Sequence, residues 1–240
     1  MTIGLFFNNI KDKKTGAKMT DKKIALISDF DGTITKEDFF NMAVDNLLSP
    51  EALKPWHDYV SGKITHIDAL TSIFSQIRLS QDEFDKFIDT IHIDKYFYDV
   101  MDFCLEYKIP VYICSAGTKY YIEKKIGGEI KKYGIKLVSN DAVYSKDKGL
   151  RLIAPDKNDP FYDKNTGISK EALVEKLNKE GYFTVYAGDG RPDLLPSKKA
   201  KAVFAKSILL DMCRKENIKT EKFENFKDIL NYLRRFYDAG

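Results

Sequence analysis

Three short apolar segments of this 240-residue chain end directly in polar loops, and this arrangement restricts the fold more than any other feature. The segments are residues 24–27, 109–114 and 183–187, and the loops begin at Asp29, Ser115 and Asp189. Short uninterrupted apolar runs are typical of strands buried on both faces of a parallel sheet. Helical patterns alternate with strand patterns after residue 109, so we predict an α/β fold with helices on both faces of a mostly parallel sheet. Because ligands bind at the carboxyl ends of such strands, we expect the three loops to form one site.

The region between the first two apolar segments, residues 36–107, carries helix signals and no strand signal. The helix starts are Ser49-Pro50, Thr65 and Ser80, which has Glu83 three residues later. We therefore predict an all-helical cap, residues 36–107, inserted into a core domain formed by residues 22–35 and 108–240. Residues 1–21 are rich in lysine between positions 11 and 18, and we expect a leader without fixed structure.

The rest of the core follows from local patterns. We expect helices at 119–133, 169–180 and 194–199 and from 225 onward, strands at 135–138 and 202–205, and a loop at 155–167. The turn residues 146–149 predict a hairpin over residues 141–154.

Charge and cysteine content exclude several kinds of partner and compartment. The chain has 39 basic and 36 acidic residues and a net charge of +3, which disfavours nucleic acid or an anionic membrane as the main partner. Its three cysteines, Cys104, Cys114 and Cys213, form no C-x-x-C pair, which fits a reducing cytoplasm. No apolar run approaches the length of a membrane span, and the short apolar patch near the N-terminus lacks a small-residue cleavage site.

Asp29 and Asp31 place two carboxylates one residue apart, just after a buried strand, where Gly32 allows the chain to turn. One acid can attack phosphorus as a nucleophile, and the other is close enough to transfer a proton. An ordinary aspartate-rich turn would have the same sequence. The five residues Asp29–Thr33 do not decide between the two on their own.

The segment 188–193, Gly-Asp-Gly-Arg-Pro-Asp, adds two acids after another strand. Mg²⁺ prefers oxygen ligands, and Asp29, the backbone carbonyl of Asp31 and Asp189 would supply them. Asp193 would ligate the ion directly or support the site by hydrogen bonding. A helix cap followed by an exposed acid would also explain this segment.

Phosphoryl transfer also needs donors and positive charge around the phosphate oxygens. Ser115, together with backbone N–H groups at Ala116 and Gly117 that we expect to open a helix, can supply the donors. Lys170, at the start of its own helix, can supply the charge. Without a phosphate site, Ser115 would be a simple helix cap and Lys170 a surface lysine.

The aromatic residues and histidines of the cap have structural interpretations. We expect Trp56, Tyr59 and Phe74 to form the core of the cap, and a substrate-facing Trp56 is the less favoured interpretation. The three histidines, His57, His66 and His92, lack metal-ligand spacing and are expected to be surface or structural residues.

The ordered set DFDGT at 29–33, ICSAG at 113–117, Lys170 and GDGRPD at 188–193 resembles the haloacid dehalogenase (HAD) superfamily. The resemblance covers nearly all of residues 23–237 and implies a Rossmann-like three-layer core with a type 1 cap, as in the phosphoserine-phosphatase-like subfamily IB. It implies an Mg²⁺-dependent phosphatase with Asp29 as nucleophile and Asp31 as general acid and base. By the same resemblance, Asp29, Asp31, Asp189 and Asp193 would form the metal site, and Ser115 and Lys170 would hold the phosphate.

The expected substrate is a small phosphorylated metabolite. Asp38, Trp56, residues 62–64 and the GDGRPD form resemble the branch of methionine-salvage diketo-methylthiopentyl phosphate phosphatases and phosphocholine phosphatases. Phosphoserine as the specific substrate is a second candidate, weakened by Pro192 and by Arg78, which is displaced from the expected cap arginine. Two further functions stay open, a phosphotransferase such as a phosphomutase and a catalytically silent binding protein. Asp38 is the best candidate for substrate specificity, and the sequence does not indicate an oligomeric state.

Overall fold

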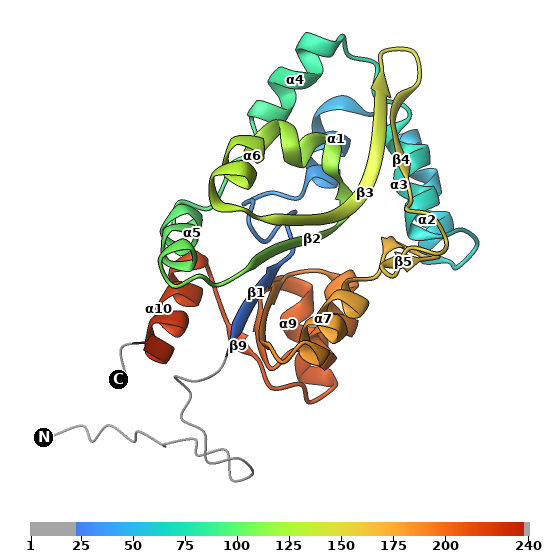
Figure 1. The fold of residues 1–240 in the computed structure, drawn as a ribbon. Helices are drawn as coiled ribbons and strands as arrows, with labels where there is room; N and C mark the ends of the chain where they lie inside the picture. Colours follow the sequence, from blue (N-terminus) through green and yellow to red (C-terminus); the bar gives the residue numbers. More distant parts are fainter. Residues whose placement is uncertain (1–22, 238–240) are drawn as a thin grey trace, which may run out of the picture.

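The computed structural model describes residues 23–237 and has a seven-stranded sheet at its centre (Figure 1). The strand order is β4-β3-β2-β1-β7-β8-β9, and every neighbouring pair is parallel except β3 and β4, which form an antiparallel hairpin. The strands are β1 (Ile24–Ser28), β2 (Val111–Thr118), β3 (Lys136–Ser145), β4 (Gly149–Ile153), β7 (Phe183–Gly188), β8 (Ala202–Ala205) and β9 (Glu221–Lys222). A separate two-stranded ribbon joins β5 (Tyr162–Asp163) and β6 (Gly167–Ile168). The mostly parallel sheet confirms the predicted α/β class.

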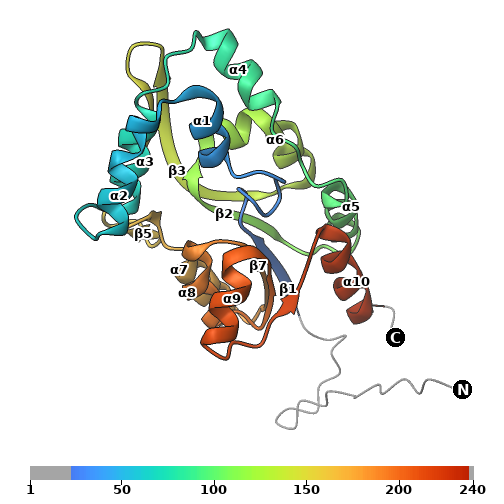
Figure 2. The same ribbon diagram turned by 180° about the vertical axis from the view of Figure 1, so that it is seen from behind.

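Helices cover both faces of the sheet because successive strand residues point to opposite sides. Ile24 and Leu26 of β1 belong to the apolar cluster that includes α5 (Phe97–Glu106), α6 (Lys119–Tyr133) and α10 (Phe226–Tyr237). Ala25 and Ile27 belong to the opposite cluster, which includes α7 (Lys170–Lys179). The short helix α8 (Leu194–Lys199) and α9 (Ser207–Lys215) lie on the same side as α7 (Figure 2). The result is the three-layer core that the sequence predicts.

The segment between β1 and β2 is helical in the structure. It contains α1 (Phe39–Leu47), the 3-10 helix η2 (Pro50–Leu53), α2 (Lys54–Val60), α3 (His66–Phe74), α4 (Gln81–Asp89) and α5. Within this segment α2 packs against α3, α3 packs against β4 and α4 packs against α6, whereas α5 packs mainly against α10 (Figure 1). The division into cap and core at residues 36 and 107 stays a prediction, and the predicted leader, residues 1–21, lies outside the described residues.

Local capping explains where these helices begin. Thr65 accepts a hydrogen bond from the Asp68 amide, and Ser80 and Glu83 form a complete capping box, as the sequence predicts. Ser169 caps α7 in the same way. The capped helices are therefore among the elements that the sequence locates most closely.

Several elements differ from expectation. Strand β3 runs from Lys136 to Ser145 and includes the first arm of the hairpin, because its second half pairs with β4. The ribbon β5–β6 lies within the segment predicted as a loop and at its end, and α9 and β9 were not predicted. Strand β2 continues through Thr118, so residues 115–117 are extended and do not open a helix.

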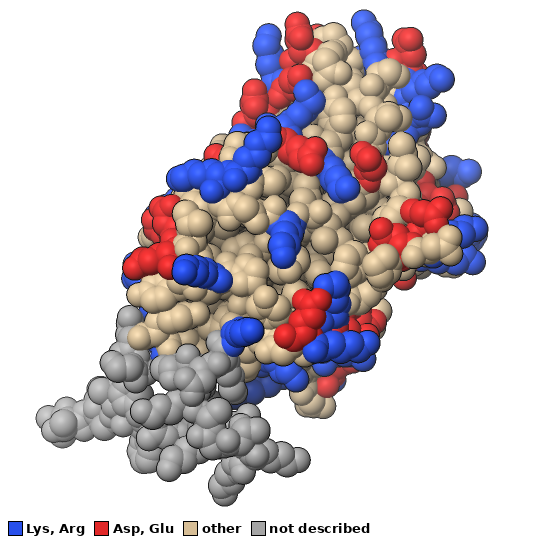
Figure 3. All heavy atoms as spheres, in the orientation of Figure 1, with Lys and Arg blue, Asp and Glu red and all other residues tan. Residues whose placement is uncertain are grey.

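Acidic and basic side chains are interspersed over the face shown in Figure 3, with no large area of one sign. Within residues 23–237, no helix is both long and apolar enough to cross a membrane.

Candidate active site

Three polar segments meet because β1 lies at the centre of the sheet between β2 and β7. Ser28, the last residue of β1, is in register with Ile113 on one side and Ala187 on the other. Asp29, Ser115 and Asp189 therefore emerge at the same edge and line one cavity of about 330 Å³. The convergence that the sequence predicted is present, and Asp31, Ala116 and Lys170 line the same cavity.

Asp29 is buried and paired with a buried lysine. Lys170 places its Nζ 2.8 Å from Asp29 Oδ1 and 2.7 Å from Asp193 Oδ1. Burial alone would lower the pKa of Lys170, but the two carboxylates outweigh it and raise the pKa, so the ammonium stays charged. Burial and the nearby Asp193 carboxylate raise the pKa of Asp29, and Lys170 opposes this effect. The second carboxylate oxygen of Asp29 accepts no hydrogen bond from the described residues.

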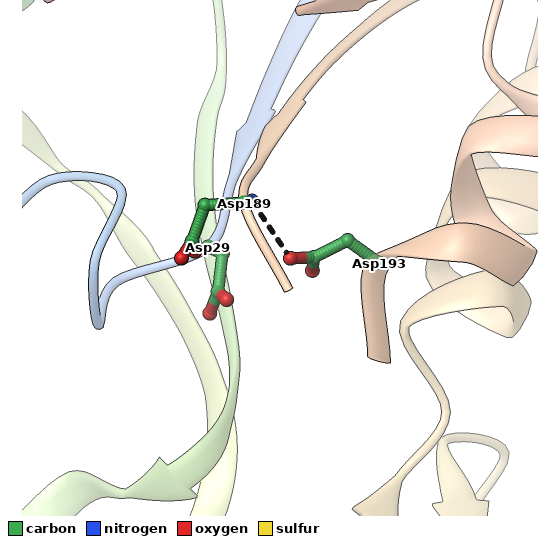
Figure 4. Close-up of side chains that lie close together, drawn as sticks. All are labelled: Asp29, Asp189 and Asp193. Carbon is green, nitrogen blue, oxygen red and sulfur yellow. Dashed lines mark hydrogen bonds between the residues drawn. The ribbon is translucent and has the colours of Figure 1, made fainter. Parts of the chain in front are cut away.

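Asp193 is fully satisfied by protein donors. Its Oδ1 accepts from Lys170 and from the Tyr186 hydroxyl at 2.6 Å, and its Oδ2 accepts from the amides of Asp189 and Gly190 at 3.0 and 2.9 Å. Figure 4 shows the bond from the Asp189 amide. With four donors on two oxygens, Asp193 is suited to holding the loop and Lys170 in place.

Asp189 approaches the turn after β1 very closely. Its Oδ1 accepts a hydrogen bond from Thr33 Oγ1 at 2.9 Å. A Cβ atom on Gly32 would collide with the Asp189 carboxylate, and Gly32 has a φ of +67°, so glycine is required there on both counts. Burial, followed by repulsion from Asp193, raises the pKa of Asp189 to about 7.

This group of acids fits a divalent cation. Carboxylate oxygens of Asp29, Asp189 and Asp193 lie within 4.8 Å of one another (Figure 4). Mg²⁺ is usually bound in proteins through one or two carboxylates and keeps several waters, and Asp29 and Asp189 could supply these carboxylates. Burial and then repulsion from Asp193 raise the pKa values of Asp29 and Asp189, and a bound divalent ion would offset the repulsion between these carboxylates.

Asp31 is held by the hydroxyl of a buried tyrosine and by a backbone amide. The Tyr121 hydroxyl donates to Asp31 Oδ2 at 2.6 Å, and the Phe39 amide donates to Oδ1 at 3.3 Å. Burial, followed by repulsion from Asp38, raises the pKa of Asp31 to about 7. Gly117 makes the tyrosine contact possible, since a Cβ there would overlap the Tyr121 hydroxyl. Asp31 can therefore exist in either protonation state near neutral pH.

The expectation that Ala116 and Gly117 open a helix is wrong. Both residues belong to β2, and α6 begins at Lys119 with Thr118 as its N-cap. The Gly117 amide is already used, because it donates to Ser115 Oγ at 2.9 Å. Ser115 is buried at the cavity with its hydroxyl 3.5 Å from Asp31 Oδ2, so its side chain is still available to a phosphate.

The helical segment between β1 and β2, the predicted cap, contributes aromatic residues to the cavity. We call the following residues the cap half of the cavity: Phe40, Trp56, Tyr59, His66, Leu70 and Phe74. Trp56 packs against the apolar core cluster, but it and Tyr59 are only partly buried and also line the cavity, so the prediction of a purely structural role is incomplete. The prediction for His66 is incomplete too, because this histidine is buried and lines the cavity, whereas His57 and His92 are exposed.

Asp38 also lines the cavity, and it caps α1 by accepting the Phe40 amide at 2.6 Å. Burial raises the pKa of Asp38. Arg78 is exposed, donates to backbone carbonyls of Ser75 and Ile77, and does not line the cavity. The role of Asp38 in specificity stays a prediction.

No family model matches the chain. A curated protein of Bacillus cereus (strain ATCC 10987 / NRS 248), named 2-hydroxy-3-keto-5-methylthiopentenyl-1-phosphate phosphatase, is 28% identical over 218 residues, covering 90% of this chain and 98% of that protein. A solved phosphoserine phosphatase with a phospho-aspartyl intermediate analogue matches with a TM-score of 0.63 and 20% identity, covering 88% of this chain and 99% of that one. A HAD family hydrolase from Salmonella enterica serovar Typhi matches with a TM-score of 0.66 and 16% identity, covering 89% and 72%. In sequence the chain is similar to these curated phosphatases, and in fold it is similar to HAD phosphatases. It is a phosphoric monoester hydrolase.

The candidate active site also contains residues to which the sequence assigns no role. Thr33 lies within the DFDGT motif, so its contact with Asp189 had a sequence signal. Tyr121 and Tyr186 had none, because their hydroxyl contacts depend on how α6 and β7 pack. Asn140 is similar: it is buried and donates to the backbone carbonyls of Ala116 and Thr166.

Proposed function

We propose that this phosphatase hydrolyses a small phosphate monoester through a phosphoryl group carried by Asp29. The observation that supports this most directly is the position of Asp29 at the end of the central strand. One of its oxygens is held by Lys170, and the other accepts no hydrogen bond from residues 23–237. A fixed carboxylate with one available oxygen is the arrangement that an in-line attack on phosphorus requires.

Asp31 would move the protons of the reaction. In the first step, Asp29 forms a bond to phosphorus, the ester P–O bond breaks, and protonated Asp31 gives its proton to the leaving oxygen. In the second step, water attacks phosphorus, Asp31 accepts the proton of that water, and the bond to Asp29 breaks to release phosphate. A pKa of about 7 supports both roles, because neither protonation state is then costly near neutral pH.

Ser115, Ala116 and Lys170 are proposed to hold the phosphate. The Lys170 ammonium is charged and fixed between Asp29 and Asp193, so it can offset charge on the phosphate oxygens without rearranging. The Ser115 hydroxyl is buried at the same cavity. Ala116 is included as a phosphate-binding residue because it follows Ser115 in β2 and lines the same cavity.

Mg²⁺ is proposed as the cofactor, with Asp29, Asp189 and the Asp31 carbonyl as its ligands and Asp193 holding the loop. When bound, the ion would neutralise charge on the transferring phosphoryl group. The four donors already on Asp193 favour the supporting role for that residue over direct ligation.

The printed name of the Bacillus relatives makes 2-hydroxy-3-keto-5-methylthiopentenyl-1-phosphate a first substrate to assay. We also retain the cytoplasm as the proposed location, because Cys104, Cys114 and Cys213 are free and buried, as suits a reducing compartment.

The test is phosphate release from p-nitrophenyl phosphate with Mg²⁺. Asp29→Asn should lower turnover at least about 1,000-fold, because an amide cannot accept the phosphoryl group. Asp45→Asn, an exposed change on α1, is the matched control. Acid-quenched parent enzyme should carry a phosphoryl adduct on the peptide containing Asp29. Parent-like turnover by Asp29→Asn would exclude the mechanism.

A further inference from the structure

Asn140 lies where the pairing of β2 with β3 is interrupted. Ser115 is in register with Ser139. The next pair joins Thr118 to Asn140, so two residues of β2 lack a register partner in β3. A buried backbone carbonyl without a ladder partner needs another donor. The Asn140 side chain supplies it, because its amide donates to the Ala116 carbonyl at 2.9 Å. Asn140 therefore fixes the end of β2 that carries Ser115.

The same amide group holds a second segment of the site. It donates to the Thr166 carbonyl at 3.0 Å, directly before β6. After β6, Ser169 caps α7, whose first residue is Lys170. One side chain thus joins the strand end that carries Ser115 to the segment that leads into Lys170. These two residues supply the side chains proposed to hold the phosphate, so Asn140 is placed to set the distance between them.

Asn140 has little freedom to move. Its side chain is fully buried, and a Cβ atom on Gly167 would collide with its Oδ1. That oxygen accepts no hydrogen bond within residues 23–237. A buried carbonyl oxygen without a donor is unfavourable, so the benefit of an asparagine here comes from its two N–H donors. The donors and the tight fit together make the connection rigid.

Asn140 does not line the cavity, so it can affect a bound phosphate only through its neighbours. Ser115, Ala116 and Lys170 do line the cavity. A donor must lie within hydrogen-bond distance of a phosphate oxygen, and a displacement of about 1 Å can lower the rate of a reaction about 100-fold. Loss of the two Asn140 bonds should therefore weaken phosphate binding without removing any group that touches the phosphate.

We infer that Asn140 is a positioning residue for phosphate binding, which keeps the end of β2 and the segment before Lys170 at the separation that a phosphoryl group needs. The inference rests on the proposed function and adds to it a residue outside the cavity. Because the phosphoryl group is common to all phosphate monoesters, the effect should not depend on the leaving group.

The first experiment measures the Ki of inorganic phosphate as a competitive inhibitor of p-nitrophenyl phosphate hydrolysis with Mg²⁺. Asn140→Ala removes both donors without adding charge, and it should raise this Ki about 10-fold or more. Inorganic phosphate has no leaving group, so the change cannot arise in the cap half of the cavity. An unchanged Ki in Asn140→Ala would overturn the inference.

Asn140→Asp keeps the shape of the side chain and turns an oxygen toward each of the two carbonyls. It should raise the Ki at least as much as Asn140→Ala does. A rise in Asn140→Asp alone would assign the effect to the added charge and would also overturn the inference.

Two controls separate positioning from a general loss of stability. Ser139→Ala changes the neighbouring residue of β3, whose buried hydroxyl has no hydrogen-bond partner within residues 23–237, and it should keep the Ki of the parent. Ile229→Ala changes a buried residue of α10 that does not line the cavity. It should lower Tm and keep the Ki at a temperature where the variant is folded. If Ile229→Ala raises the Ki as much as Asn140→Ala, the role of Asn140 is merely structural.

Calorimetry of inorganic phosphate binding with Mg²⁺ separates this inference from the proposed function, because it needs no turnover. If the parent does not hydrolyse p-nitrophenyl phosphate, the proposed function fails, and a Kd about 10-fold higher in Asn140→Ala would still support the positioning role. Equal Kd values in an active parent and in Asn140→Ala would reject the positioning role alone. A parent that binds no phosphate would reject both.

Discussion

Tyr121 is the residue whose chemistry depends most on its exact neighbours. Its ring is fully buried and stacks on Phe39 with centroids 4.2 Å apart, so its hydroxyl is fixed against Asp31 Oδ2. A carboxyl group that must give and then accept a proton works best when its orientation is held. Tyr121 thus acts through Asp31 as a positioning residue in the proposed reaction.

Tyr121→Phe should lower kcat about 10-fold and leave KM nearly unchanged, because the phosphate-binding groups are not touched. Steady-state kinetics on p-nitrophenyl phosphate measures both values. Tyr120→Phe is the control, since its hydroxyl bonds Gln81 on the outside of the same helix. An unchanged kcat, or a change confined to KM, would contradict the positioning role.

His66 makes stability depend on pH. Its pKa is lowered from 6.5 to about 4 in the folded protein, so the unfolded chain binds a proton in this range that the folded protein does not. The contribution is complete above pH 6.5 and is lost as the pH falls toward 4. Between pH 7.5 and 5 the parent should therefore lose about 2 kcal/mol more unfolding free energy than His66→Phe.

Urea unfolding at the two pH values measures that difference. His57→Phe, an exposed neighbour, should keep the pH dependence of the parent. The same pH dependence in the parent and in His66→Phe would show that His66 takes up its proton equally in both states.

The site residues that the sequence predicted lie at strand ends, whereas those that it missed are brought to the cavity by tertiary packing. Asp29, Ser115 and Asp189 follow from strand ends, which are readable as apolar runs followed by polar residues. Tyr121 and His66 reach the cavity through tertiary packing of α6 and α3, and their local sequence contains no sign of it. Motif residues are therefore predictable, whereas the residues that tune them are not.

At the scale of elements, the sequence is informative where caps and turns use side chains. Helix α7 is bounded by a capping serine, and the hairpin turn lies where the sequence placed it. Helix α9 was not predicted because its start has no capping side chain that could serve as a sequence signal. Its first residue, Ser207, has a φ of +49°, which a serine does not indicate in the sequence. Strand β9 has only two residues, which is too short for the alternation of apolar and polar residues that identifies a strand.

Helix α3 joins the cap to the core through Asn165. Asn165→Ala removes the acceptor for the His66 amide and keeps the backbone bond to Ile67. Since this side chain satisfies a free amide at a helix start, its loss should cost about 1 kcal/mol of stability and raise KM for esters with long leaving groups.

Thermal unfolding and KM values for n-pentyl and methyl phosphate test this prediction. Asn158→Ala, in the same loop, is the control, because its amide bonds only to Asp156. A KM that rises equally for both esters would place the effect outside the cap half of the cavity.

At the scale of the whole molecule, the cap is tied to the core at several points besides Asn165. The Tyr144 hydroxyl of the β3–β4 hairpin donates to the Leu79 carbonyl at 2.7 Å, and its ring stacks on Phe84 at 4.0 Å. Lys124 of α6 pairs with Asp85 of α4 at 2.8 Å. The lining of the cavity contains four carboxylates but only two basic side chains, Lys170 and Arg191, so acidic groups are in excess there.

That charge predicts how the whole molecule responds to a divalent cation. Mg²⁺ should raise Tm, because an ion that binds only the folded protein at about 100 times its Kd adds about 2.7 kcal/mol. Asp189→Asn should unfold at a higher temperature than the parent in EDTA, because it removes a carboxylate repelled by Asp193 while an amide oxygen can still accept from Thr33. The same variant should gain little from Mg²⁺. Asp211→Asn, an exposed change on α9, should respond to Mg²⁺ as the parent does, and an equal gain in Asp189→Asn would place the cation elsewhere.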